Sequence, residues 1–204
     1  AKNNIHVGEQ LGHLAKSLRA DAVIPFSSHH QYQRTDSLWA QEYVTPLHAY
    51  EHGFPGDIEF IPPFVDVECP SGDYLSISPK QIEIAPRPPE YFGDNWSDEL
   101  DTQDRKIIDK YFWRKELIRN RIGYINLVVG GKTHTTLLNR KSKKGITFEL
   151  PRNSLMTAVE MEIFDDLLIG NFMKTTLHKM RSLYESEFTF SVAKYADNGR
   201  AETE

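Results

Sequence analysis

Cysteine is nearly absent from this sequence. Cys69 is the only one among 204 residues, which excludes an internal disulfide, a thiolate zinc cluster and an iron–sulfur centre. No apolar run approaches the roughly 20 residues that a bilayer span needs. The stretch from Ala1 to His13 also lacks the apolar core of a signal peptide. We therefore expect a protein of the reducing cytoplasm that has no membrane partner.

The chain also lacks an excess of positive charge. It has 24 Lys and Arg against 29 Asp and Glu, a formal net charge of -5. This balance argues against a protein whose main task is to hold a phosphate backbone, so we expect no nucleic-acid partner. With 39% apolar and 26% charged residues, the composition is that of a globular protein with one large or two small domains.

Residues 1–96 combine a helix–strand unit with a proline-rich segment. A helical stripe of apolar residues comes first: Val7, Leu11, Leu14 and Leu18. Residues 22–26 then read as a short buried strand, and both elements need a sheet to pack against. Residues 46–89 hold nine of the eleven prolines, which predicts an extended segment wrapped over a core, with short edge strands at most.

Residues 97–204 read as a second unit of helix, β-meander and helix. The pattern predicts a helix over 98–121 and then strands over 124–129, 133–139 and 145–150. A further helix begins at Asn153 or Ser154, carries the stripe Leu155, Val159, Ile163 and Leu167, and ends at Gly170 as its C′ residue. Alternation of Phe188, Phe190 and Val192 indicates a last strand. The predicted fold class is α+β.

Candidate site residues follow the first predicted strand. His29 and His30 come directly after it, at the strand end where open α/β sheets gather ligands. Arg34 and Asp36 follow closely and give the loop both signs of charge, which makes them candidate catalytic residues. A capped turn with one exposed and one hydrogen-bonded histidine is the alternative interpretation.

A second candidate site is the run from Phe164 to Met173. Asp165, Asp166 and Asn171 offer oxygen ligands for a cation or a polar substrate. Adjacent residues on a helix point about 100° apart, so a helix end with exposed acids is the alternative. The sequence Gly130-Gly-Lys-Thr resembles the end of a phosphate-binding loop. A phosphate-binding loop is followed by a helix, whereas a strand is predicted here, which favours a hairpin turn.

The stretch from Val7 through Ile24-Pro-Phe-Ser-Ser-His-His to Ala40 resembles the last helix and strand of a metallo-β-lactamase-fold domain. The similar branch holds the metal-dependent hydrolases grouped with ascorbate-6-phosphate lactonase and the sialic-acid hydroxylase. Five later segments of the sequence resemble the C-terminal extension found in uncharacterised members of that branch. They are Gly93-Asp-Asn-Trp, Val129-Gly-Gly-Lys, Ile146-Thr-Phe-Glu-Leu-Pro-Arg, Phe164-Asp-Asp-Leu-Leu-Ile-Gly-Asn-Phe and Lys194-Tyr-Ala-Asp-Asn-Gly-Arg.

The resemblance implies a divalent metal (Zn, Mn or Fe) in the full-length protein, with His30, or else His29, as its last ligand. Such a metal lowers the pKa of a bound water and supplies a hydroxide nucleophile. The main motif of the superfamily, His-x-His-x-Asp-His, is missing from this sequence. We therefore expect a fragment that is inactive alone, whose partner is the missing N-terminal half and whose uncovered apolar surface forms a homo-oligomer.

The alternative hypothesis is a non-enzymatic ligand-binding or assembly module. A helix over 98–121 laid on the 123–150 sheet would form an apolar pocket or dimer face, somewhat as in sterol-carrier-like domains. The residues expected to line it are Leu127, Val129, Phe148 and Leu155.

Overall fold

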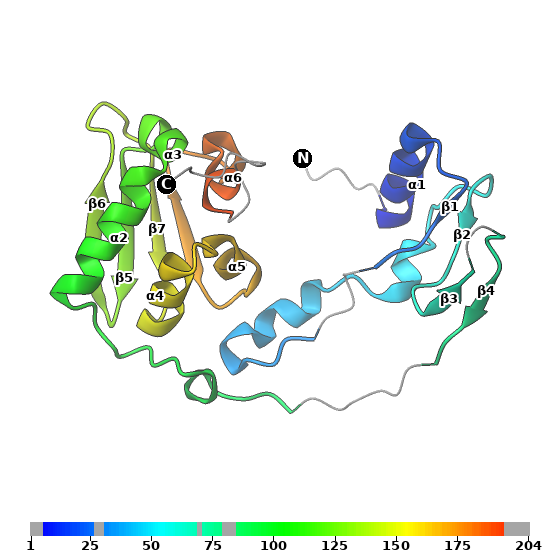
Figure 1. The fold of residues 1–204 in the computed structure, drawn as a ribbon, viewed down its shortest axis with the longest axis horizontal. Coiled ribbons are helices and arrows are strands. Elements are labelled where there is room, and N and C mark those ends of the chain that lie inside the picture. Colours follow the sequence, from blue (N-terminus) through cyan, green and yellow to red (C-terminus); the bar gives the residue numbers. More distant parts are fainter. Residues whose placement is uncertain (1–5, 27–30, 69–70, 79–84, 194–204) are drawn as a thin grey trace. The chain divides into compact units, whose positions relative to one another are not determined.

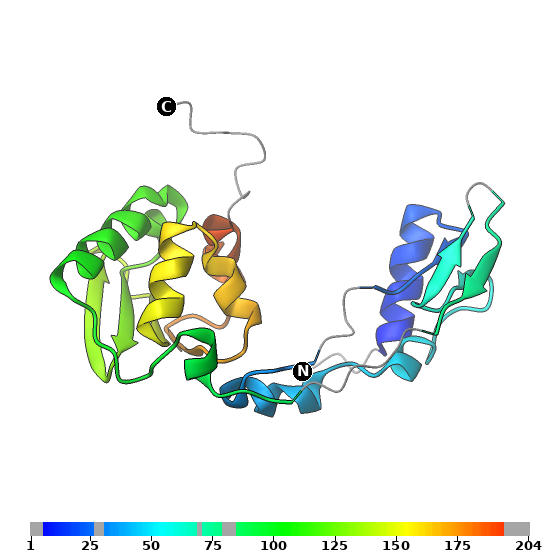
Figure 2. The ribbon, with the colours of Figure 1, turned by 60° about the horizontal axis from the view of Figure 1, so that its bottom comes forward.

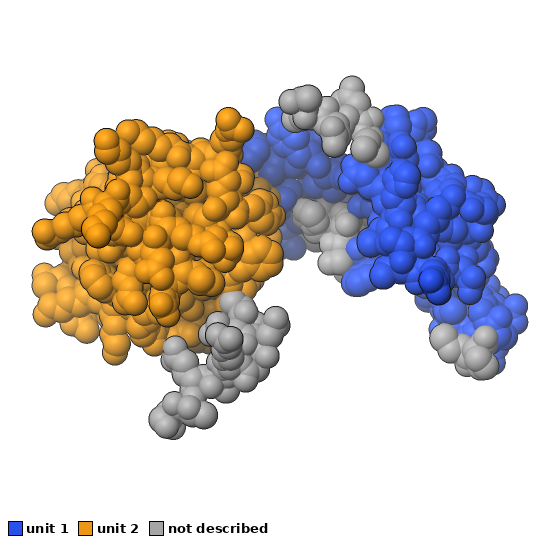
Figure 3. Space-filling view, turned by 90° about the horizontal axis from the view of Figure 1, so that it is seen from above, with its two compact units in different colours: residues 1–33, 38–86 blue, residues 34–37, 87–204 orange. Residues whose placement is uncertain are grey.

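A computed structural model describes residues 6–26, 31–68, 71–78 and 85–193. The chain has an α+β fold and divides into two compact units (Figures 1 and 3). Unit 1 consists of residues 1–33 and 38–86, and unit 2 of residues 34–37 and 87–204. A single boundary after residue 96 was predicted, and the contribution of residues 34–37 to unit 2 is not evident from the sequence.

Unit 1 contains short elements. They are α1 (Val7–Leu18), β1 (Ala22–Val23), the 3-10 helices η1 (Thr35–Tyr43, which begins in the unit 2 segment) and η2 (Leu47–Tyr50), β2 (Glu59–Phe60), β3 (Val65–Val67) and β4 (Tyr74–Ser76). β1 pairs in parallel with β2, and β3 pairs antiparallel with β4. The expectation of short strands at most in the proline-rich segment is confirmed.

α1 is present as predicted, but its buried face is not the leucine stripe. Leu14 and Leu18 are 55% and 70% exposed, and the helix instead buries Gly8, Gly12 and Ala15. A methyl group on Gly8 would lie 2.5 Å from the carbonyl oxygen of Tyr50, so these small residues allow the segment after η2 to approach the helix backbone. The helical period of the pattern was right, but the predicted buried face was wrong. The buried face needs small residues because a neighbouring backbone segment packs closely against it.

Unit 2 is built on one four-stranded sheet. Its elements are η3 (Pro89–Phe92), α2 (Thr102–Arg114), α3 (Glu116–Arg121), β5 (Tyr124–Val129), β6 (Lys132–Leu137), β7 (Gly145–Glu149), α4 (Arg152–Glu160), α5 (Phe164–Ile169), β8 (Lys174–His178), η4 (Tyr184–Ser186) and α6 (Phe188–Val192). The strand order is β6-β5-β7-β8, and Figures 1 and 2 show the helices gathered against this sheet.

The predicted meander is wrong. β6 pairs antiparallel with β5 through the Gly130-Gly131 turn, but β7 pairs in parallel with β5 on its other side. The chain of residues 138–144 therefore crosses the start of β5, where Gly123 donates to the carbonyl oxygen of Lys144 at 2.8 Å. β6 carries mostly exposed polar side chains, whereas β7 buries Ile146 and Phe148, so β6 stays at the edge and β7 takes the inner place.

The predicted last strand is also wrong, because residues 188–192 form the helix α6. Phe188 and Val192 are buried four residues apart, while Phe190 between them is 64% exposed, which is helical spacing. The real fourth strand, β8, was not predicted, because its residues Lys174, Thr175 and Thr176 are exposed at the sheet edge.

Both long predicted helices are divided. The first splits at Lys115 into α2 and α3, and α2 begins after Asp101, whose side chain accepts from two backbone amides. The second splits into α4 and α5. α4 begins after Pro151 instead of Asn153 or Ser154, and Gly170 ends α5 in a right-handed conformation instead of the left-handed one expected of a C′ glycine.

One apolar core lies between the sheet and the helices of unit 2. Rings of Phe148, Phe164 and Phe188 pack with centroids 5.3–5.9 Å apart, and Phe112 joins them. All 21 residues of this core cluster belong to unit 2. The four residues expected to line a pocket are all inside it, with exposures of 0–1%: Leu127, Val129, Phe148 and Leu155.

Candidate functional site

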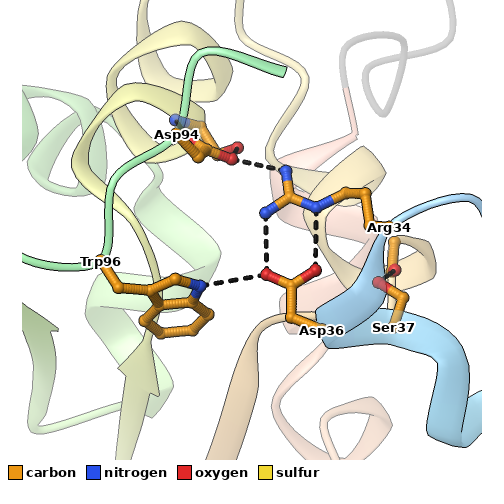
Figure 4. Close-up of polar contacts among 7 residues, drawn as sticks. Arg34, Asp36, Ser37, Asp94 and Trp96 are labelled. Atoms are coloured by element: carbon orange, nitrogen blue, oxygen red, sulfur yellow. Dashed lines mark hydrogen bonds and ion pairs between the residues drawn. The ribbon is translucent and has the colours of Figure 1, made fainter. Parts of the chain in front are cut away.

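Arg34 is the centre of a polar cluster inside unit 2 (Figure 4). Its guanidinium forms two parallel hydrogen bonds with Asp36: Nε donates to Oδ1 at 3.0 Å and Nη2 to Oδ2 at 2.9 Å. Nη1 donates to Oδ2 of Asp94 at 2.5 Å. Arg34 and Asp36 arise from one short segment, whereas Asp94 lies 60 residues along the chain, just after η3. The cluster therefore joins two distant parts of the sequence.

The carboxylate of Asp36 has a further donor. The indole Nε1 of Trp96 donates to its Oδ2 at 3.0 Å (Figure 4). Burial of the Asp36 carboxyl opposes its ionisation, but the hydrogen bonds from Arg34 and Trp96 and the charge of Arg34 outweigh that effect. The pKa of Asp36 consequently lies below its ordinary value.

Asp94 is 1% exposed and has every side-chain oxygen in use. Besides the bond from Arg34, its Oδ1 accepts from the backbone amide of Ser154 at 2.9 Å, and its Oδ2 accepts from the Ser154 hydroxyl at 2.6 Å. Since Ser154 lies in the first turn of α4, Asp94 caps that helix from a distance and neutralises Arg34 at the same time.

Aromatic rings and one further hydrogen bond complete the cluster. The guanidinium carbon of Arg34 lies 4.0 Å from the ring centroid of Phe172 and 5.6 Å from that of Phe92. The Ser37 hydroxyl donates to the carbonyl oxygen of Gly170 at 2.8 Å. We call Arg34, Asp36, Ser37, Asp94 and Trp96 the Arg34 clamp, because these residues hold the segment 34–37 in unit 2.

The structure brings the two predicted catalytic residues together as ion-pair partners. Arg34 and Asp36 are bound to each other, with 14% and 18% of their side chains exposed. Opposite charges that fully occupy each other fix a segment in place. The arrangement therefore supports positioning by these two groups.

The predicted substrate-binding residues lie on and after α5. Asp166 is exposed, whereas Oδ1 of Asp165 is buried and has no hydrogen-bond partner within the described part of the chain. Asn171 has a φ of 57° and donates to the carbonyl oxygen of Ile169 at 3.0 Å. Gly170, which separates α5 from Asn171, accepts the bond from Ser37, so this run borders the Arg34 clamp.

The predicted metal ligands His29 and His30 lie outside the described residues. Within residues 6–26, 31–68, 71–78 and 85–193, no group of three His, Cys, Asp or Glu side chains is placed to hold a metal ion. The ligands present in the described part therefore do not fit a metal site by themselves.

Three members of the Arg34 clamp were not predicted: Ser37, Asp94 and Trp96. Asp94 and Trp96 lie in the segment Gly93-Asp-Asn-Trp, which carried part of the resemblance but had no assigned role. Ser154, which donates to Asp94, was expected only as a helix cap. The available signal was an aspartate two residues before a tryptophan, just after the proline-rich segment. Its partner, 60 residues earlier, could not be read from spacing.

Comparison with protein-family models, curated proteins and solved structures finds no match to this chain. Among the helices that the structure describes, none has the length and apolar character needed to cross a membrane.

Proposed function

We propose that this chain is the C-terminal part of a metal-dependent hydrolase of the metallo-β-lactamase type. The observation that carries the proposal is the Arg34 clamp, which begins four residues after His30. The clamp fixes the chain at Arg34 by charge-assisted hydrogen bonds to two carboxylates within unit 2.

The packing of unit 1 supports the same proposal. Its buried apolar residues are few, while many large apolar side chains are exposed, among them Leu18, Phe26 and Leu75 at 70–80%. A unit with this much uncovered apolar surface fits a domain that normally packs against further structure. The short parallel pair of β1 and β2 is consistent with the margin of a larger sheet.

The chemistry of the full protein would come from a metal-bound hydroxide. This chain contributes no described metal cluster, so no reaction step is assigned to its residues. In this proposal Arg34, Asp36 and Asp94 fix the chain after Gln33, because one guanidinium is hydrogen-bonded to two carboxylates. They are positioning residues in this proposal.

The test is metal content in the protein expressed from the start of its reading frame. We expect a motif His-x-His-x-Asp-His upstream of Ala1, and bound Zn, Mn or Fe measured by mass spectrometry of the purified protein. The substitution His30→Ala should remove most of that metal. His134→Ala is the matched control and should retain it, because His134 pairs with Asp109 on the β6 side of unit 2. An upstream sequence without the motif, or full metal content in H30A, would overturn the proposal.

A ligand-binding pocket receives less support than the hydrolase. The four side chains that would line it are buried in the aromatic core, so they face other side chains and not a cavity open to ligand.

A further inference from the structure

One face of the unit 2 sheet carries an aromatic ring laid flat on a glycine. A methyl group on Gly145 would lie 2.2 Å from Cζ of Tyr124 and 2.5 and 2.6 Å from its two Cε atoms. These nearly equal distances mean that the face of the ring, and not its edge, covers Gly145. His178 on the next strand lies beside it, with ring centroids 5.8 Å apart. Tyr124 is only half-buried, so part of its ring is open to solvent.

The face on which Tyr124 lies is opposite the core. Side chains alternate along β5, so Ile125, Leu127 and Val129 enter the core while Tyr124, Asn126 and Val128 point the other way. The buried apolar residues of α2 to α6 all belong to that single core. The Tyr124 face is therefore the outer face of the sheet.

Polar side chains cross this outer face from strand to strand. Thr135 on β6 donates to Oδ1 of Asn126, whose Nδ2 donates to the hydroxyl of Thr147 on β7 at 3.1 Å. The same hydroxyl lies 2.8 Å from Nε2 of His178 on β8. These groups can exchange hydrogen bonds with a polar ligand laid across the strands. Leu137, which pairs with Tyr124 in the β5–β6 ladder and is 57% exposed, adds an apolar side chain beside the ring.

Basic residues from two segments meet at the Tyr124 end of the sheet. Four lie on the loop that crosses the start of β5 (Arg140, Lys141, Lys143 and Lys144), and two follow β8 (Lys179 and Arg181). Because Gly145 pairs with His178 in an antiparallel ladder, Lys144 and Lys179 flank the same end of that ladder. None of the six side chains has a carboxylate partner among the described residues, although Arg121 nearby pairs with Glu187.

We infer that this face of unit 2 binds single-stranded nucleic acid. A flat, half-open aromatic ring stacks on a base, the basic edge attracts the phosphate backbone, and the polar belt contacts sugars or base edges. The inference departs from the expectation of no nucleic-acid partner, which rested on net charge. The overall charge is negative, but the fold collects positive charge at one edge. The inference is independent of the proposed hydrolase.

The test uses the 204-residue chain and fluorescein-labelled 20-nucleotide oligouridine, with fluorescence anisotropy as the readout. We expect saturable binding that weakens as salt rises. The double substitution Lys141→Glu with Lys143→Glu should weaken binding at least about tenfold. It should also flatten the slope of log affinity against log salt concentration by roughly 0.7 for each phosphate that is no longer neutralised. Lys106→Glu with Lys110→Glu, on the exposed side of α2, is the matched control and should leave binding unchanged.

Stacking is tested separately at Tyr124. Tyr124→Ala should weaken binding by about 5- to 100-fold, the range expected for loss of one base-stacking ring. Tyr124→Phe keeps the ring and should retain binding, which separates stacking from the phenol hydroxyl. Tyr91→Ala removes a ring that is 68% exposed outside this face and should have no effect. Circular dichroism confirms that each variant is folded.

Three outcomes would overturn the inference. They are absence of oligouridine binding at low salt, equal weakening by the α2 control pair, and full binding by Tyr124→Ala. Binding to vesicles containing phosphatidylserine without binding to oligouridine would also overturn it and would assign the basic edge to a membrane surface.

Discussion

Arg34 satisfies two carboxylates at once, and only a guanidinium has the geometry for both. Its planar fork matches the two oxygens of Asp36, while the third nitrogen reaches Asp94. The ring of Phe172 packs against the same plane. A lysine ammonium carries the same charge but can neither form the parallel pair of bonds nor stack on a ring.

We therefore predict that Arg34→Ala and Arg34→Lys both destabilise unit 2. Removal of the cation leaves Asp94 buried without its counter-charge, which costs on the order of 3 kcal/mol of unfolding free energy. Arg34→Lys should cost less than Arg34→Ala but more than Lys106→Ala, an exposed control. Urea unfolding followed by circular dichroism measures the order. Equal stability of the lysine variant and the wild type would show that the fork geometry does not matter.

The pKa of Asp36 leads to a pH prediction. Because this pKa is lower in the folded protein than its ordinary value, ionised Asp36 stabilises the fold above about pH 4. That contribution is lost as the pH falls through the folded-state pKa. The difference in unfolding free energy between the wild type and Asp36→Asn should thus be constant near neutrality and shrink in acid. A difference that stays constant down to about pH 2.5 would contradict this account.

Among the elements, α1 shows a conflict between helix propensity and packing. Replacing a helical glycine with alanine stabilises an unhindered helix by about 1 kcal/mol. At Gly12, however, a methyl group would lie 2.2 Å from Cδ of Pro55.

We predict that Gly12→Ala lowers the thermal stability of unit 1 despite its better propensity. Ser17→Ala, at an exposed position of the same helix, should leave the midpoint of the circular dichroism melt unchanged or raise it. A higher midpoint for G12A would mean that the contact with Pro55 gives way easily.

The elements also show how far the sequence could predict this fold. Period-2 and period-3.6 patterns located β5, β6, β7 and α1 almost to the residue, because those patterns come from local burial. These patterns could not predict which strands pair with each other. The pairing of β7 with β5 depends on which of two strands is more apolar, and the break at Lys115 leaves no proline or glycine signal.

The site was predicted in part. Arg34 and Asp36 stood out because opposite charges followed a predicted buried strand, and the structure places both in one cluster. The strand itself was predicted wrongly, since β1 spans only Ala22–Val23 and Phe26 is 80% exposed. Their engagement with Asp94 and Trp96 depends on the return of the chain 60 residues later, which no local pattern encodes. His29 and His30 lie outside the described residues, so their role as ligands stays a prediction.

At the scale of the whole molecule, the two units differ in how they are stabilised. Unit 2 has a continuous core of aromatic and aliphatic side chains, whereas unit 1 buries few apolar residues and leaves Leu14 and Leu18 of α1 exposed in a row. Exposed apolar surface of this kind promotes association between copies.

We predict that the 204-residue chain self-associates through α1. Multi-angle light scattering should give a mass above 23.5 kDa that rises with concentration. Leu14→Ser with Leu18→Ser should shift the mass toward the monomer, while Leu137→Ser, at a 57% exposed position of unit 2, should not. A monomer at all concentrations would remove the case for a homo-oligomer.

Unit 2 is discontinuous, since four of its residues come from a segment embedded in unit 1. A gene cut between codons 86 and 87 would deliver Asp94 without the guanidinium that neutralises it and Trp96 without its acceptor. A fragment of residues 87–204 would therefore lack contacts that stabilise unit 2. No single cut in the chain separates the two units intact, although their elements resemble those of two independent domains.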